Sequence, residues 1–568
     1  MRRVPPEHVL QGGQPLICPQ NPRAFAHKTL RTAPLVSPER FVRAAAEYSP
    51  LVRICCGQGG ICLPKKVPIF YSALLLTGVN LLLRLVGTSF QVYLSGRIGA
   101  AGIGLLQLTM SVGSLAMVAG MAGIRTATMY LTAEELGRRQ KGNVTWVLSA
   151  CFLYSLLCSG AAAAVLFGSA SRISRFWIGD IRTAAALRLL AVFLPVTCLC
   201  GVMTGYFTAA NRIGTLAAVE VAEQLCSMAA TMLALTLWAG SDPGRACQCV
   251  ILGSCLGSCL TLGCLVFLRL REAGPSSQRI PVRSRLLQAA VPLALADVLK
   301  SGINTTENLM VPKRLALNTL VEDPLAAFGC VSGMVFPVMM FPACILFGLA
   351  ELLIPELARC RAAGSTRRIS HLVRRSLKTA LLYGLFFCGI LFLLAEDLCM
   401  ALYQNAEAGR YLRLYALLVP MLYCDAITDA MTKGLGQQKA CVRYNILTSA
   451  MDVVFLYFLL PEYGMEGYFL SFLITHLVNF ILSLRRLLKI TGQRIPFSVP
   501  ALAAASAAGA IRGASLLDAP AARCLVFAAL LGALLVLLNV VRREDLAWAA
   551  GLLRPPGSQN KPSRKASG

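Results

Sequence analysis

Acidic residues are scarce in this sequence, and charge of either sign is sparse. Asp and Glu number 27 against 54 Lys and Arg, and the four charged types make up 14% of the chain, whereas roughly 25% is usual in a soluble domain. Apolar residues make up 56% of the 568, and the mean hydropathy is +0.64. This composition excludes an ordinary soluble protein and predicts an all-α membrane protein that crosses the bilayer many times.

Several signatures of enzymes and bound cofactors are also missing. The GxxxxGK[ST] phosphate loop does not occur, which argues against ATP hydrolysis by this chain. Most of the 22 Cys lie singly or at small-residue spacing inside apolar stretches. Cysteine acts there as a small apolar side chain, and no further role is needed to explain it. The cluster of Cys55, Cys56 and Cys62 lacks the paired spacing of a zinc site. We therefore expect no metal, no cofactor and no catalytic residue.

Long apolar stretches dominate the rest of the chain. A helix needs about 20 apolar residues to cross the hydrocarbon, and about fourteen such stretches occur. They lie near 68–95, 103–131, 144–168, 185–209, 215–239, 248–268, 286–311, 325–355, 372–395, 410–432, 442–461, 466–488, 497–515 and 520–541. The first external loop, about 96–102, is short and has no carboxylate, which argues against a polyprenyl-phosphate glycosyltransferase.

Basic residues gather in alternate loops. The segments "ELGRRQKGN", "LRLREAGPSSQRIPVRSR" and "RRISHLVRRSLK" all fall on the side that the positive-inside rule assigns to the cytoplasm. Both termini are then cytoplasmic. The net charge of +27 therefore indicates topology and contact with anionic membrane lipids, and we expect no nucleic acid partner.

The two ends of the chain differ from the apolar middle. Residues 1–64 are basic and carry no long apolar run, and no apolar segment follows the initial "MRR", so they predict a disordered cytoplasmic tail and no signal peptide. Residues 542–568 are predicted to form a second disordered cytoplasmic tail.

The sequence pattern of the first six spans recurs in the next six. The segments "GYFTAANRIGTLAAVEVAEQ" and "KGLGQQKACVRYNILTSAMD" each combine a glycine turn, a short polar link and an apolar helix with acidic residues. Gly205 and Gly434 correspond, as do Pro68 and Pro292, and six spans separate each pair. The pattern predicts two parallel six-helix lobes, 65–270 and 271–490, followed by two C-terminal helices in 491–541.

Polar residues mark one face of span one and one face of span seven. On span one they are Asn80, Arg84, Thr88, Gln91 and Ser95, and on span seven they are Asp297, Lys300, Asn304 and Glu307. Steps of three and four residues place each set on one helical face, and Asp297 and Lys300 are close enough to pair. Because lipid cannot satisfy such groups, we expect both faces to line a hydrated cleft between the lobes.

Other charged residues inside spans have two interpretations. They are Arg125, Glu220, Glu223, Glu351, Asp425, Asp429, Asp452 and His476. Arg125 either binds substrate or reaches the cytoplasmic face. Glu220 and Glu223 fit the role of structural partners for a basic neighbour, and a single histidine is more often a packing residue than a proton relay. We retain Arg125 and Asp425 as candidate binding residues.

The segments "LLLRLVGTSFQVYLSGRIGAAGIGLLQL", "AGMAGIRTATMYL", "GMVFPVMMFPACILFGLAELLIPELA" and "KGLGQQKACVRYNIL" resemble the stage V sporulation protein B branch of the multidrug/oligosaccharidyl-lipid/polysaccharide flippase superfamily. This resemblance covers roughly residues 65–495. It implies a multi-pass protein of the bacterial cell membrane that alternates access between two lobes, and a lipid-linked, pyrophosphate-bearing sugar in a basic cavity. Arg84 matches the branch's first-helix arginine.

Two transport functions remain open from the sequence, beside a non-transporting scaffold for cell-wall or spore machinery. A guanidinium binds phosphate oxygens in charge-assisted pairs, so Arg84 favours a flippase for a peptidoglycan or spore-cortex precursor such as lipid II. A cation-coupled multidrug extruder of the same fold would use carboxylates, and Asp297, Glu307 and Asp425 could supply them. A coupling ion fits either function.

Overall fold

The computed structural model describes residues 69–137, 141–240, 242–271, 282–493 and 498–541. The regular elements in these ranges are all helices. The two predicted tails and Pro68 lie outside the described residues, and so does the side chain of Asn80.

The first lobe begins with a long bent helix. The helix α2 (Ile69–Met121) contains one non-helical residue, Gly99, with φ of 69°, a conformation that glycine adopts without steric cost. The loop expected at 96–102 is therefore a one-residue break between two spans. The remaining helices of this lobe are α3 (Ile124–Gly137), α4 (Lys141–Arg172), η2 (Ile173–Ile178), α5 (Thr183–Ala209), α6 (Ile213–Ala234), η3 (Leu235–Ala239) and α7 (Pro243–Leu270).

The second lobe has the same kind of bend near its end. The helix α16 (Gln438–Thr491) turns at Gly464, with φ of 56°, and so forms two spans. The preceding helices are α8 (Arg283–Leu315), α9 (Pro324–Gly329), η4 (Cys330–Val335), α10 (Phe336–Met340), α11 (Ala343–Ala362), α12 (Thr366–Leu393), α13 (Ala395–Tyr403), α14 (Ala406–Tyr415), η5 (Ala416–Leu418) and α15 (Val419–Gly434). The helices α17 (Ser498–Ala514) and α18 (Pro520–Leu537) follow.

The span count agrees with the sequence prediction. The described residues hold ten helices long and apolar enough to cross a membrane, or eleven when the bent pair α9–α11 is counted as one span. Two of these, Leu81–Leu136 and Gln438–Thr491, have 56 and 54 residues, which is enough for two crossings each. With α17, whose 17 residues fall just short, the prediction of about fourteen spans in an all-α membrane protein is confirmed.

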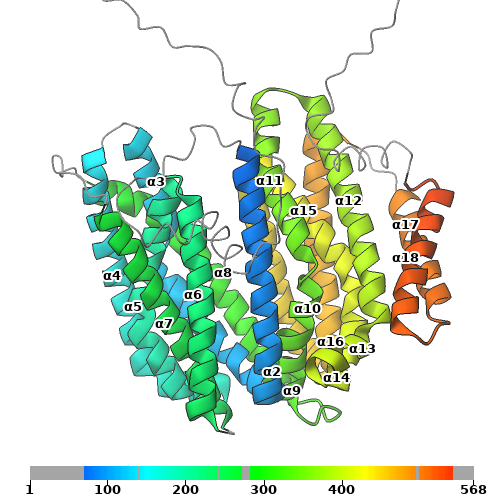
Figure 1. Ribbon diagram of the computed structural model, residues 1–568, viewed down its shortest axis with the longest axis horizontal. Coiled ribbons are helices and arrows are strands. Elements are labelled where there is room, and N and C mark those ends of the chain that lie inside the picture. The colour runs from blue at the N-terminus through cyan, green and yellow to red at the C-terminus, as the bar shows by residue number, and fades with distance from the viewer. Residues whose placement is uncertain (1–68, 138–140, 241, 272–281, 494–497, 542–568) are drawn as a thin grey trace, which may run out of the picture. The chain divides into compact units, whose positions relative to one another are not determined.

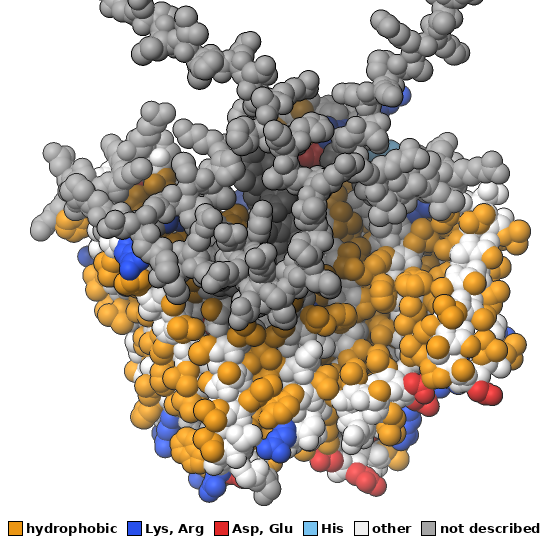
Figure 2. All heavy atoms as spheres, viewed as in Figure 1, with side chains coloured by type: hydrophobic (Ala, Val, Ile, Leu, Met, Phe, Trp, Pro, Cys, Tyr) orange, Lys and Arg blue, Asp and Glu red, His pale blue; other side chains and the backbone are white. Residues whose placement is uncertain are grey.

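Apolar side chains cover the outer face of the helices. Figure 2 shows broad hydrophobic areas on the described part of the surface, with basic and acidic side chains near the ends of the helices. Leu157, Val165 and Leu237 expose 65%, 70% and 77% of their surface. Such exposure suits a lipid solvent, because acyl chains are as apolar as these side chains.

The matched glycines of the repeat sit at equivalent close contacts. A Cβ atom on Gly205 would lie 2.5 Å from the Arg125 carbonyl oxygen, and one on Gly434 would lie 2.8 Å from the Ile354 carbonyl oxygen. Each contact joins the fourth span of a lobe to its second span. Only glycine allows the two backbones to approach this closely.

The two C-terminal helices pack on α12, as Figure 1 shows for α17 and α18. Phe527 of α18 is fully buried, and its ring occupies the space that a side chain at Gly389 of α12 would need. Ala503, Ala507 and Ala510 line the buried face of α17. The pair is therefore a small-residue hairpin attached to the second lobe.

Candidate functional site

The eighth span is broken near its middle. The helices α9–α10 and α11 meet at a bend of 63°, next to Phe341 and Pro342, and η4 is a π-helical turn just before it. Proline removes a backbone donor and clashes with the preceding turn, which explains the bend. Such breaks leave carbonyl groups that need other partners inside a membrane.

Side chains from three other elements satisfy these carbonyl groups. The Tyr383 hydroxyl of α12 donates to the Pro342 oxygen at 2.7 Å, and the Tyr423 hydroxyl of α15 donates to the Met339 oxygen at 2.8 Å. The Tyr403 hydroxyl, from α13, donates to the Met334 oxygen at 3.3 Å.

Gln91 of α2 belongs to this set of donors. Its side-chain nitrogen donates to the Gly333 oxygen at 3.0 Å, so the glutamine side chain is hydrogen-bonded to the broken span. Ser95, one turn further on, is 4% exposed. This end of the predicted polar face of span one is therefore packed against protein rather than open to a cleft.

Arg84 lies two turns before Gln91 on the same helix. Its side chain is exposed, and the nearby Cys344 at the start of α11 is within its electrostatic range. No described carboxylate forms an ion pair with it. Thr88 donates only to the Arg84 backbone oxygen, at 2.9 Å. A cation inside a membrane span without a described anionic partner is a functional candidate by default.

The polar residues of α8 face different neighbours. Asp297 and Lys300 are both exposed, and the expected ion pair between them is not among those that the described residues form. Exposed pairs of this kind gain little energy and cost side-chain entropy. Asn304 is also exposed, whereas Glu307 is turned toward α16.

Glu307 meets Asp452 between α8 and α16. The two carboxyl groups lie within electrostatic range of each other, and α8 packs against α16. Ser471 donates to Asp452 Oδ1 at 2.5 Å, and Thr475 donates to the same oxygen at 3.2 Å. A proton or a cation would stabilise two carboxyl groups placed near each other in this way, since two unscreened negative charges repel. Asp452 is 5% exposed, so bulk water does not screen the pair.

Asp425 has its own partner away from this pair. The side-chain nitrogen of Asn479 donates to its two carboxylate oxygens at 3.0 and 3.2 Å. Its neighbour Asp429 forms an ion pair with Lys433 at 2.6 Å. These contacts support a structural role for Asp425, because they tie α15 to the last span of the lobe.

In the first lobe the acidic residues contact nearby groups. Arg125 is exposed and lies within electrostatic range of Glu220. Glu223 accepts hydrogen bonds from Thr261 at 2.7 Å and from Ser258 at 3.4 Å. Glu220 thus has the basic neighbour that the structural interpretation expects, whereas the donors to Glu223 are two hydroxyl groups.

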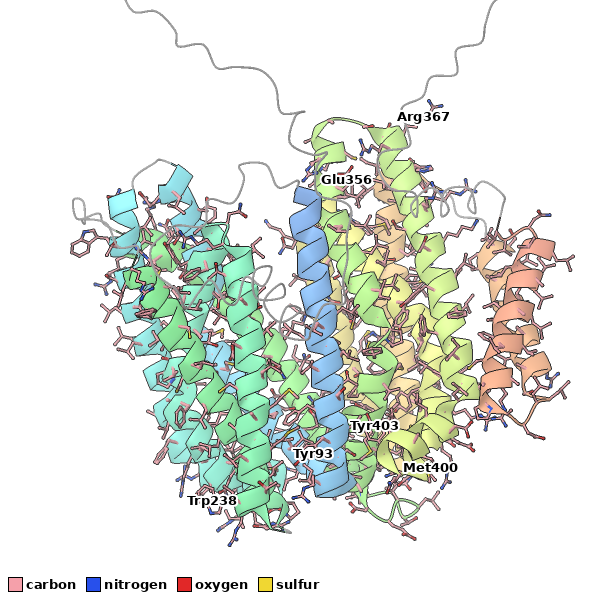
Figure 3. The ribbon with its side chains drawn as sticks, viewed as in Figure 1. Tyr93, Trp238, Glu356, Arg367, Met400 and Tyr403 are labelled. Atoms are coloured by element: carbon pink, nitrogen blue, oxygen red, sulfur yellow. The ribbon has the colours of Figure 1, made fainter. Side chains whose placement is uncertain are left out.

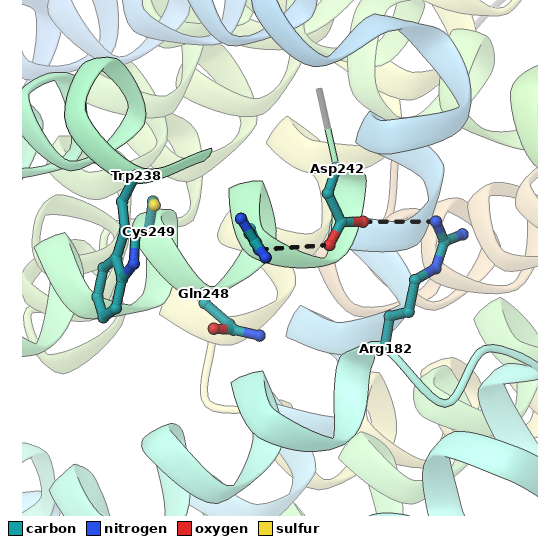
Figure 4. Close-up of a pocket in the computed structure, with 6 residues that line it drawn as sticks. Arg182, Trp238, Asp242, Gln248 and Cys249 are labelled. Carbon is teal, nitrogen blue, oxygen red and sulfur yellow. Dashed lines mark hydrogen bonds and ion pairs between the residues drawn. The ribbon is translucent and has the colours of Figure 1, made fainter. Parts of the chain in front are cut away.

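A cavity of about 380 Å³ lies elsewhere, between the η2–α5 turn and the start of α7 (Figure 4). The charged side chains of its lining form ion pairs with one another, since Arg182 and Arg245 pair with Asp242 at 3.4 and 4.0 Å. Arg182 also hydrogen-bonds Asp180 and holds the pKa of that carboxyl below its usual range. The cavity contains none of the predicted site residues.

Comparisons with known proteins agree with this fold and with the sequence motifs. The family model MatE matches residues 292–458. Stage V sporulation protein B of Bacillus subtilis (strain 168) is 20% identical over 420 residues, which are 71% of this chain and 80% of that protein. The inward closed conformation of lipid II flippase MurJ has a TM-score of 0.65 at 12% identity, covering 84% of this chain and 100% of that chain. The predicted resemblance to the stage V sporulation protein B branch is confirmed.

A second solved structure with a similar fold is a transporter of the MOP superfamily. It is the inward-facing conformation of a multidrug resistance MATE family transporter, with a TM-score of 0.57 at 14% identity, covering 74% of this chain and 100% of that chain. The matched region 292–458 contains Glu307 and Asp452 but not Arg84. The chain therefore carries two distinct charged features, one inside the matched region and one outside it.

Sequence spacing did not reveal two of these features. The contact of Glu307 with Asp452 joins spans that are distant in the chain, and the tyrosine donors around the eighth span come from three separate elements. The available signals were an acidic residue inside each apolar span and the two prolines Pro337 and Pro342 within ten residues of the π-helical turn.

Proposed function

We propose that this chain is a flippase that moves a lipid-linked, pyrophosphate-bearing oligosaccharide or peptidoglycan precursor across the bacterial cell membrane. It would act by alternating access between the two lobes, in cell-wall or spore-cortex synthesis, with both termini in the cytoplasm. The observation that supports it is Arg84, a guanidinium within span one that has no described carboxylate partner. A pyrophosphate group would supply the missing negative charge and accept two parallel hydrogen bonds from the guanidinium.

Lys300 and Arg125 are candidates for secondary contacts. Both side chains are exposed within membrane spans, and both would add positive charge to the same substrate. Arg125 has Glu220 within electrostatic range, so its charge is already partly balanced. We therefore assign the principal phosphate contact to Arg84.

The pair of Glu307 and Asp452 supports cation coupling of this transport. A proton or a monovalent cation between the two carboxyl groups would neutralise them. The same feature favours the second candidate function, a cation-coupled multidrug extruder. The two functions differ in what enters the central site: an anionic lipid carrier for the flippase and an organic cation for the extruder.

The test is lipid II translocation in proteoliposomes with Arg84→Ala and Arg84→Lys. Loss of a charge-assisted contact to phosphate costs roughly 1.5 to 3 kcal/mol, which is about a ten- to hundredfold fall in substrate occupancy. Arg84→Lys keeps the charge but not the planar fork, so it should retain part of the activity. Arg97→Ala is the matched control, because Arg97 is an exposed arginine on the same helix.

Three outcomes separate the candidates. Loss of flipping by a stable Arg84→Ala protein, with normal Arg97→Ala activity, supports the flippase. Wild-type flipping by Arg84→Ala makes this arginine a structural residue and removes the supporting observation. Efflux of cationic drugs by the wild-type chain, without lipid II translocation, supports the extruder.

A further inference from the structure

A buried tyrosine hydroxyl in the second lobe lacks a partner. The Tyr415 side chain is 0% exposed, and its hydroxyl has no hydrogen bond in the described structure. Its ring is held by Phe336, Phe469 and Tyr468, with centroid distances of 5.7, 5.5 and 6.3 Å. A buried hydroxyl without a partner costs free energy, so this position calls for a ligand, and a water molecule is the ordinary one.

Polar groups of α14 and α16 lie near this hydroxyl. Tyr411 and Asp452 both lie within its electrostatic range, as does Tyr468. Tyr468 in turn lies within range of Glu307 and Asp452 and is 3% exposed. Tyr468, whose ring packs on Tyr415, lies one turn before Ser471, the residue that donates to Asp452 Oδ1. The orphan hydroxyl therefore belongs to one cluster with Tyr411, Tyr468 and Asp452.

The chain of polar groups continues to the surface along α14. Tyr411, one turn before Tyr415, donates to Glu407 Oε1 at 2.8 Å. Glu407 is exposed and lies one further turn along the same helical face. Figure 3 places Met400 and Tyr403, just before this helix, at the end opposite Arg367. In the proposed orientation that end is external.

We propose that Glu407, Tyr411, Tyr415 and Tyr468 form a proton path from the external side to the pair of Glu307 and Asp452, with a bound water at the Tyr415 hydroxyl. This proposal rests on the proposed function in one respect, the assignment of the α14 end to the external side of the membrane. All of its residues belong to helices of the second lobe.

Proton transfer along this path leaves each tyrosine neutral. Once Glu407 is protonated, the Tyr411 hydroxyl, which donates to Glu407 in the structure, turns its hydrogen toward the bound water. Glu407 then passes its proton to the Tyr411 oxygen as that hydroxyl releases its own proton to the water. The water releases a proton toward Tyr415 and Tyr468, which accept and release one each. The carboxyl pair gains one proton, external water loses one, and no bond between heavy atoms changes.

Three other titratable groups lie near the path. They are Cys330 of η4, Arg410 of α14 and His476 of α16. Cys330 is 0% exposed, and Arg410 lies on the exposed side of α14. His476 packs its ring 4.1 Å from that of Phe472 and lies within range of Asp452. None of the three connects Glu407 to the carboxyl pair.

The experiment is proton uptake by proteoliposomes that carry a trapped pH-sensitive dye, after acidification of the side that α14 faces. Tyr415→Phe removes the oxygen and retains the ring contacts. We expect uptake at least tenfold slower than in the wild type, with an unchanged thermal midpoint. Tyr411→Phe should act in the same direction, and Tyr463→Phe, at a tyrosine that is 56% exposed, should have no effect.

The outcomes distinguish this path from the proposed function. Wild-type uptake by Tyr415→Phe overturns the path, and so does a wild-type chain that flips lipid II but takes up no protons. Tyr415-dependent uptake in a chain that does not flip lipid II retains the path and rejects the flippase. The double variant Glu307→Gln with Asp452→Asn sets the background rate, because it removes both acceptors at the end of the path.

Discussion

The close contact at Gly205 allows a quantitative prediction. An added Cβ atom would lie 2.5 Å from the Arg125 carbonyl oxygen, about 0.8 Å inside an ordinary carbon–oxygen contact of about 3.3 Å. The obstacle is backbone, so it cannot rotate away. Overpacking of this kind costs about 1 to 3 kcal/mol, and alanine regains roughly 1 kcal/mol through its higher helix propensity. We expect Gly205→Ala to lower stability by up to about 2 kcal/mol.

The assay is the fraction of detergent-solubilised protein that remains monodisperse after heating. Gly434→Ala should behave like Gly205→Ala, because its Cβ would lie 2.8 Å from the Ile354 oxygen. Gly160→Ala is the control, since a Cβ at Gly160 in α4 meets nothing within 4 Å, and it should leave the midpoint equal or higher. Equal midpoints for Gly205→Ala and Gly160→Ala would refute the argument that the close contact constrains the lobe.

Two further predictions concern the broken span and the orientation of the chain. Tyr423→Phe leaves the Met339 carbonyl without its hydroxyl donor and should cost about 1 to 3 kcal/mol in the same heating assay, whereas Tyr463→Phe should cost nothing; similar midpoints for both would contradict the assigned role. In a cysteine-free background, Met400→Cys should react with an impermeant maleimide in whole cells and Arg367→Cys only after permeabilisation, and the reverse pattern would invert the proposed topology.

The spans were predictable because the bilayer imposes one strong requirement. Each crossing needs about 20 apolar residues, and that run is visible without any tertiary contact. The turns were less predictable. A loop was expected at 96–102, but a single residue with positive φ, Gly99, is enough to interrupt the helix there.

The polar contacts were predictable only where they are local. Periodicity placed Arg84 and Gln91 on one face of span one, yet it could not show that Gln91 is used by the Gly333 carbonyl. The i, i+3 spacing suggested an ion pair of Asp297 with Lys300. The partner that matters for Glu307 is Asp452, on a span whose position depends on packing of the whole lobe.

The helix α8 has a consequence for the biogenesis of the protein. Leu286 and Ala290, near its start, are buried in the same cluster as Ile124 and Val202 of the first lobe, whereas Leu309 and Leu315, near its end, are buried in a larger cluster that contains residues of both lobes. The apolar core of the first six spans is therefore completed only when the seventh has been synthesised and inserted. A nascent chain that ends after α7 would expose the unfilled site to lipid, so the two halves of the repeat are not independent folding units.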